Sequence, residues 1–121
     1  MALGISVVEW AGTGMIHLTA STPILIATEP ANFRCGIDGF VARCQHTLGH
    51  DPRSGTLFAF INRGRTMVRI LAYDTNGYWL CTKRLSKGRY RGWPKSDEPI
   101  NPLQAQQLRR LLSNVLDSGD E

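Results

Sequence analysis

Nine lysine and arginine side chains gather between residues 63 and 95, and only one carboxylate, Asp74, lies among them. This stretch therefore carries a charge of +8, and the remaining chain carries −4 of the total +4. A one-sided concentration of positive charge attracts phosphate backbones through counterion release. We expect a nucleic acid to be the partner of this stretch, and solvated surface charge that aids solubility is the alternative.

Aromatic side chains alternate with cations near the end of the stretch. Trp93 precedes a proline, which holds it extended and suits it to anchor on the domain. Tyr90 stands between two arginines and is expected to stay at the surface and stack on bases. The predicted DNA-binding residues are Arg63, Arg65, Arg69, Lys83, Arg84, Lys87, Arg89, Tyr90, Arg91 and Lys95.

Catalytic and metal chemistry find little support in the spacing of other polar residues. Asp38 has no acid or base beside it, and Cys44, His46 and His50 match no common zinc pattern. The sequence contains no paired carboxylates, no nucleophile and base set and no glycine-rich phosphate loop. We predict a protein that is not an enzyme, with no catalytic residue, metal or cofactor.

Three apolar runs, at residues 56–61, 66–73 and 78–85, must position the cations. Each run is rich in β-branched and aromatic residues, and the turns at 62–65 and 74–77 each contain a glycine able to adopt positive φ. This pattern predicts a three-stranded antiparallel meander.

Side chains alternate between the two faces of such a meander. One face is dry and mostly aliphatic, and it predicts a core made of Leu57, Ala59, Ile61, Val68, Ile70, Ala72, Trp79 and Cys81. The other face mixes aromatics with cations. It is either a second packed face or a stacking surface for nucleic acid, and its members are Phe58, Phe60, Met67, Arg69, Leu71, Tyr73, Tyr78, Leu80, Thr82 and Arg84.

The remaining elements are a short strand and two helices. Residues 24–26 read as a buried strand at an edge of the meander. A first helix is expected over residues 32–49 with Asn32 as its N-cap, and its glycines are attributed to close packing on the sheet. A second helix is expected from Asn101-Pro102 to about residue 116, where it covers the sheet or mediates a dimer.

These elements predict one small α+β domain: a three-stranded antiparallel meander plus a short N-terminal strand, covered by two helices. Residues 1–14 are a possible N-terminal extension whose apolar run forms a small hairpin with residues 15–18 or lies loosely on the domain. Residues 15–116 form the domain, and residues 117–121 form an acidic flexible tail. No apolar segment is long enough to cross a membrane, so we expect a cytoplasmic protein without a membrane partner.

Several separated motifs occur in order along the chain: residues 32–40, Asp51-Pro52-Arg53-Ser54-Gly55 with Leu57-Phe58, Arg69-Ile70-Leu71, Lys83-Arg84-Leu85, and Gly88-Arg89-Tyr90 with Trp93-Pro94. Together they resemble the TnpB-type accessory proteins of the IS66 group of bacterial insertion sequences, which are unrelated to the RNA-guided nucleases of the same name. The similarity covers residues 15–116. Family members usually differ at Asn32, Cys35 and Arg69, where they carry an acid, a base and often lysine.

The resemblance implies a small protein encoded beside a transposase and needed for efficient movement of the element, with no catalytic residues. Together with the charge, it predicts a non-catalytic accessory protein of insertion-sequence transposition that binds DNA at the element ends or the target. The alternative is a subunit that docks on the cognate transposase through the second helix or the aromatic sheet face, without direct DNA contact.

Overall fold

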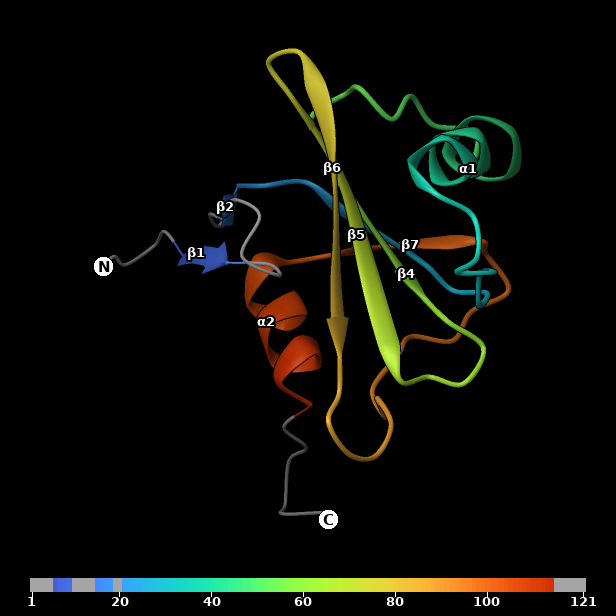
Figure 1. Cartoon of the computed structure of the whole chain (residues 1–121), viewed down its shortest axis with the longest axis vertical. Coiled ribbons are helices and arrows are strands. Elements are labelled where there is room, and N and C mark those ends of the chain that lie inside the picture. Colours follow the sequence, from blue (N-terminus) through green and yellow to red (C-terminus); the bar gives the residue numbers. More distant parts are fainter. Residues whose placement is uncertain (1–5, 10–14, 19–20, 115–121) are drawn as a thin grey trace.

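A single mixed sheet of five strands organises the chain, in the order β6-β5-β4-β3-β7 (Figure 1). The computed structural model describes residues 6–9, 15–18 and 21–114. Strands β3 and β4 are parallel, and every other neighbouring pair is antiparallel. The strands are β3 (Ile24–Ala27), β4 (Leu57–Ile61), β5 (Met67–Asp74), β6 (Gly77–Arg84) and β7 (Ile100–Leu103).

The α+β class is confirmed, but a sheet of three antiparallel strands is not what the chain forms. The three predicted runs pair antiparallel as β4, β5 and β6. The predicted strand at 24–26 adds to the edge at β4, in parallel. A fifth strand, β7, pairs Pro102 with Leu25 in the segment predicted to start a helix. Because β7 is an edge strand, its proline leaves no inner hydrogen bond unmade.

The helices cover opposite faces of the sheet (Figure 1). On one face lies α1 (Ile37–Ala42), which continues into the π-helical turn η1 (Arg43–Thr47). On the other lies α2 (Ala105–Ser113), which buries Leu108 and Leu112. The second helix therefore covers the sheet, as one of the two sequence readings has it.

Both faces of the sheet are packed. The predicted aliphatic face lies in the core beneath α2, with Trp79 partly buried at its border. Phe58, Phe60 and Leu71, from the face that mixes aromatics with cations, are buried against Phe40 of α1. The reading of that face as a stacking surface for nucleic acid is wrong, because α1 occupies it.

Both predicted helix starts are wrong. Asn32 does not cap a helix, since its Oδ1 accepts a hydrogen bond from the Arg34 N–H in a local turn, and α1 begins five residues later. A side chain at Gly39 would collide with Cys35 rather than with the sheet, and one at Gly36 would meet open space. The second helix begins at Ala105, after a capping box formed by Gln104 and Gln107.

A small antiparallel hairpin, β1 (Ser6–Glu9) with β2 (Met15–Leu18), precedes the sheet, as one sequence reading has it. It spans the predicted boundary between residues 14 and 15. The predicted tail at 117–121 and the end of the second helix at 115–116 lie outside the described residues.

The tight turns use positive φ, but not at their glycines. Arg65 has φ 62° and Thr75 has φ 46°, whereas Gly64 and Gly77, the glycines of the same two turns, do not adopt positive φ. Left-handed backbone costs a residue with a Cβ roughly 1–2 kcal/mol. Threonine is β-branched, so the turn between β5 and β6 is strained at Thr75.

Replacement of Thr75 by glycine should raise the free energy of unfolding by about 0.5–1 kcal/mol, because the relieved strain exceeds the entropic cost of glycine. Urea unfolding of the variant measures this change. Asn76→Gly is the matched control, since Asn76 does not have positive φ, and it should lose stability. A Thr75→Gly protein that is less stable than the parent would contradict the strain.

Candidate nucleic-acid interface

The turn between β4 and β5 is built by the side chain of Asn62. Its Oδ1 accepts hydrogen bonds from the N–H groups of Thr66 and Met67, at 2.9 and 3.0 Å. Its Nδ2 donates to Thr66 Oγ1 at 3.0 Å. These hydrogen bonds of the Asn62 side chain fix the backbone of the turn that carries Arg63 and Arg65.

Residues 85–95 cross the same end of the sheet and are bonded to this turn. The Leu85 N–H donates to Thr66 O at 2.9 Å, and the Tyr90 N–H donates to Arg65 O at 2.7 Å. Two separate segments that together carry six of the nine cations of the charged stretch thus lie side by side.

Asn114 clamps the crossing segment from the end of α2. Its Nδ2 donates to Arg89 O at 2.8 Å, and its Oδ1 accepts from the Arg91 N–H at 3.1 Å. Asn114 is the C-cap of α2 in the left-handed conformation, with φ 58°, which asparagine tolerates better than most residues. The clamp fixes the backbone on both sides of Tyr90.

Trp93 and Tyr90 anchor the segment in the core beneath α2. Trp93 is 4% exposed, and its Nε1 donates to Ala27 O at 2.8 Å. The predicted anchoring role of Trp93 therefore agrees with its position. Tyr90 is 2% exposed, so the prediction that it stays at the surface is wrong. Local composition favoured exposure, but the bond from its N–H to the turn directs the ring inward.

Two of the predicted DNA contacts are engaged inside the fold. Arg69 donates to Phe33 O at 2.8 Å and to Thr82 Oγ1 at 2.9 Å, and its guanidinium lies 4.9 Å from the centroid of the Phe33 ring. Lys83 Nζ donates to Leu112 O at 2.8 Å, at the negative end of the α2 dipole. Arg69 holds the turn that precedes α1, and Lys83 holds the last turn of α2, so neither cation is available to phosphates.

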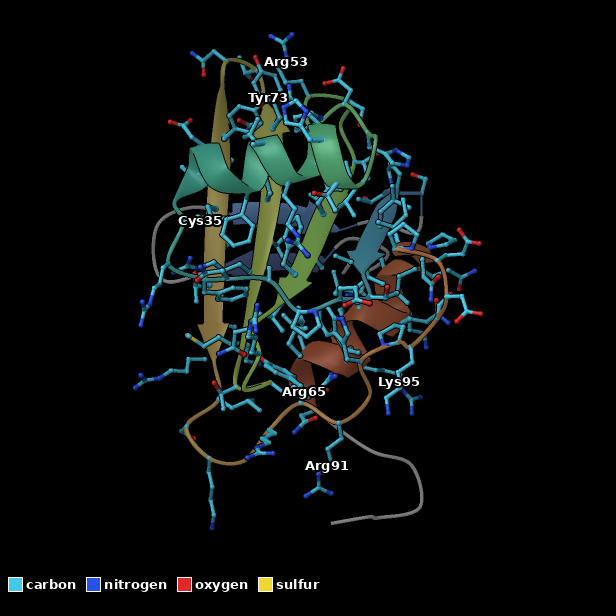
Figure 2. All side chains as sticks on the ribbon, turned by 90° about the vertical axis from the view of Figure 1, so that its right-hand side faces the viewer. Cys35, Arg53, Arg65, Tyr73, Arg91 and Lys95 are labelled. Carbon is cyan, nitrogen blue, oxygen red and sulfur yellow. The ribbon has the colours of Figure 1, made fainter. Side chains whose placement is uncertain are left out.

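Seven other predicted contacts remain at one end of the molecule. Figure 2 shows Arg65, Arg91 and Lys95 together at this end, and Arg53 and Tyr73 at the opposite end. Six of the seven remaining predicted contacts are exposed, and the seventh, Arg65, is half-buried. We call this set the basic rim, and it consists of Arg63, Arg65, Arg84, Lys87, Arg89, Arg91 and Lys95.

The rim has a positive field with little internal compensation. Within the described ranges, no hydrogen bond or ion pair engages the guanidinium groups of Arg63, Arg84 or Arg89. Asp74, the single acid of the charged stretch, is the last residue of β5, at the end of the strand far from the turn between β4 and β5. Several cations on a fixed backbone suit contact with the successive phosphates of a nucleic acid.

Outside the rim, the described residues offer few side chains for ligand or metal binding. A pocket of about 290 Å³ between residues 31–35 and the α1–η1 helix is lined by Asn32, Cys35, Arg43 and His46, among others. The part of the chain that the structure describes groups no three histidine, cysteine or acidic side chains that could hold a metal ion. In those same ranges, no helix is long and apolar enough to span a bilayer.

Sequence reasoning missed the two asparagines that position the rim. Asn62 has a detectable signal, because asparagine at the start of a turn often accepts backbone N–H groups. Asn114 also has one, as asparagine is a frequent left-handed residue at a helix end. Its role stays hidden as long as the second helix is expected to continue to residue 116.

Tyr90 provides a test of the anchored segment. Its hydroxyl is buried without a hydrogen-bond partner among the described residues, so Tyr90→Phe should leave the protein equally stable or more stable by about 1 kcal/mol. Tyr90→Ala should cost about 3–5 kcal/mol through the cavity that it leaves. Chemical denaturation of both variants measures this, and an alanine variant as stable as the parent would show that the ring is not buried.

The same burial predicts an alkaline limit to stability. Burial raises the pKa of Tyr90 from 10.0 to about 12 and that of Cys81 from 9.0 to about 11. The folded state then holds these protons more tightly than the unfolded state. For Tyr90 the stabilisation is complete below pH 10.0 and is lost as the pH rises through about 12.

The free energy of unfolding, measured from pH 8 upward, should therefore decline for the parent. Above about pH 10 it should decline less steeply for Tyr90→Phe. Identical slopes for the two proteins would mean that the Tyr90 hydroxyl is not desolvated.

Comparison with known proteins identifies a family for this chain and two relatives. The family model described as IS66 Orf2 like protein matches residues 22–117. Two curated relatives from Sinorhizobium fredii (strain NBRC 101917 / NGR234), the uncharacterized proteins y4hO and y4jC, are each 34% identical to this chain. The alignments cover 76% of this chain and 79% of y4hO, and 72% of this chain and 74% of y4jC. No solved structure matches. The chain belongs to the IS66 Orf2-like family of proteins associated with insertion sequences.

Proposed function

We propose that this insertion-sequence accessory protein binds duplex DNA through the basic rim, while the separately encoded transposase performs the bond chemistry. The observation that carries the proposal is the pair of hydrogen bonds, Tyr90 N–H to Arg65 O and Leu85 N–H to Thr66 O, that joins two basic segments into one surface. Rigid placement lowers the entropic cost of ordering cationic side chains on a phosphate backbone. The DNA in question is the end of the element or its target.

Arg65 adds a second argument. It occupies a left-handed backbone position with φ 62°, where glycine would be free of strain, and Gly64 stands beside it without using that freedom. Strain of this kind clusters at functional sites, where the side chain has a role that outweighs its conformational cost. A cation placed there supports use of the turn as a contact surface.

The alternative, docking on the transposase without DNA contact, relies on surfaces that the fold covers. The aromatic sheet face lies under α1, and the apolar stripe of α2 buries Leu108 and Leu112 against the sheet. The buried parts of these two surfaces are therefore not free to dock. Docking through other surfaces is compatible with DNA binding by the rim.

Titration of the protein with labelled duplex at two salt concentrations tests the proposal. Each phosphate contact contributes about −0.9 to the slope of log affinity against log salt, so several rim contacts should cost at least about tenfold in affinity between low and physiological salt. Element-end and scrambled duplexes should differ little, because phosphate contacts carry no sequence information. A folded protein that does not bind at low salt would refute the proposal.

Arg65→Gly separates function from stability in one substitution. The variant relieves backbone strain and should be as stable as the parent or more stable, yet it should bind DNA about two- to tenfold more weakly at low salt through the loss of one phosphate contact. Arg53→Ala removes an exposed cation at the opposite end of the molecule and serves as the control of equal charge. Equal losses of affinity in the two variants would show that net charge, and not the rim, governs binding.

A further inference from the structure

Strand β6 forms one margin of the sheet (Figure 2), and within the described ranges its only partner is β5. It is eight residues long, contains no proline, and keeps an unbroken register with β5. Proteins usually guard such an edge with proline, a bulge or a free charge, because unpaired N–H and C=O groups accept another strand. Its two cations stand at its last two positions, where Lys83 is bonded to Leu112 O and Arg84 is exposed, so residues 77–82 carry no charge that would guard the edge. We propose that β6 pairs antiparallel with β6 of a second copy of the chain.

Hydrogen bonds at the end of the strand reveal which of its backbone groups face away from β5. The Leu85 N–H donates to Thr66 O, so residue 85 faces β5. The Asn62 N–H donates to Met67 O, so odd residues of β5 face β4 and even residues face β6. Backbone direction alternates along a strand, and both bonds place the odd residues of β6 toward β5. The outward N–H and C=O groups are those of Tyr78, Leu80, Thr82 and Arg84.

The parity of these groups restricts the register of a self-pair. The outward N–H and C=O groups belong to the even-numbered residues of β6. An even-numbered residue of one copy must therefore lie opposite an even-numbered residue of the other for the two strands to form hydrogen bonds. One such register pairs the whole span 78–84 with itself, placing Tyr78 opposite the partner's Arg84 and Leu80 opposite the partner's Thr82. A shift by two residues in either direction moves pairs out of the strand and into the flanking turns, where the ladder ends.

In this register the side chains are complementary as well. The partner's Arg84 lies opposite Tyr78, so a cation meets an aromatic ring on one face of the sheet. On the other face, the aliphatic part of the partner's Lys83 side chain lies opposite Trp79. Tyr78, Trp79 and Leu80 are all partly exposed, and a second strand would cover them. Cys81 falls on the twofold axis, in a non-hydrogen-bonded pair in which Cα atoms are about 4.5 Å apart.

The dimer would join the two five-stranded sheets into one continuous sheet. The twofold axis of an antiparallel pair is perpendicular to the sheet, so the two basic rims would lie at opposite ends of the assembly. The inference does not depend on DNA binding by the rim, and its test is made without DNA.

Sedimentation equilibrium of the full chain tests the dimer. We expect a reversible monomer–dimer equilibrium for the parent. Tyr78→Lys places a cation opposite the partner's Arg84 twice in each dimer, and it should raise the dissociation constant by at least about tenfold. Tyr78→Lys combined with Arg84→Glu should restore association, because the added lysine then faces a glutamate of the partner in each of the two symmetric pairs. A monomeric parent at every concentration, or a dimer indifferent to both changes, would overturn the proposal.

Amide hydrogen exchange of the parent followed by NMR gives an independent readout that requires no substitution. The amides of Tyr78, Leu80, Thr82 and Arg84 should become protected as the protein concentration rises. The amides of Trp79, Cys81 and Lys83 bond to β5 and should be protected at all concentrations. If the four outward amides exchange equally fast when dilute and when concentrated, β6 does not pair with a second copy.

Discussion

The hydrogen bond from the Tyr90 N–H to Arg65 O is the contact on which the arrangement of charge depends. It joins a turn between two sheet strands to a segment that contains no regular secondary structure of its own. Without it, residues 85–95 would form a surface loop with four cations and no reason to lie beside Arg63 and Arg65. With it, the ring of Tyr90 turns into the core and the neighbouring arginines turn outward.

The other residues that hold the segment in place are also uncharged. Trp93 is buried in the core, and its Nε1 donates a hydrogen bond to Ala27 O, the carbonyl of the last residue of β3. Asn114 bonds to the backbone on both sides of Tyr90 and carries no charge itself. Neutral and aromatic groups therefore hold the segment, and the cations are left for a partner. Burial of uncharged groups achieves this placement at a lower desolvation cost than buried ion pairs would.

The charged stretch in the sequence splits into two populations in the structure. Arg69 and Lys83 lie within strands, and their long side chains reach the turn before α1 on one face and the end of α2 on the other. The others lie in the turn after β4, at the end of β6 and in the irregular segment 85–95. Position within a strand, rather than charge itself, decides which cations are structural.

Periodicity and turn chemistry sufficed to predict the α+β class, the three strands β4 to β6 and the aliphatic core face, because these features depend on local alternation. Strand β7 escaped prediction, since Asn101-Pro102 has the local signature of a helix start and only pairing with β3 makes it a strand. Tyr90 was misplaced for the same reason: its arginine neighbours indicate exposure, whereas a contact with Arg65, distant in sequence, buries it. The positive φ of Arg65 and Thr75 was likewise assigned to the adjacent glycines, where it costs nothing.

The most direct test of the rim as a preorganised surface uses Asn114→Gly, which keeps the left-handed conformation and the net charge but removes both hydrogen bonds to the crossing segment. Duplex affinity would be measured against salt concentration for this variant and the parent, with folding confirmed by circular dichroism. We predict an affinity lowered about three- to tenfold and a shallower salt slope, because fewer of the rim cations reach phosphates together. A folded variant with unchanged affinity and slope would contradict the central claim that the clamp positions the rim.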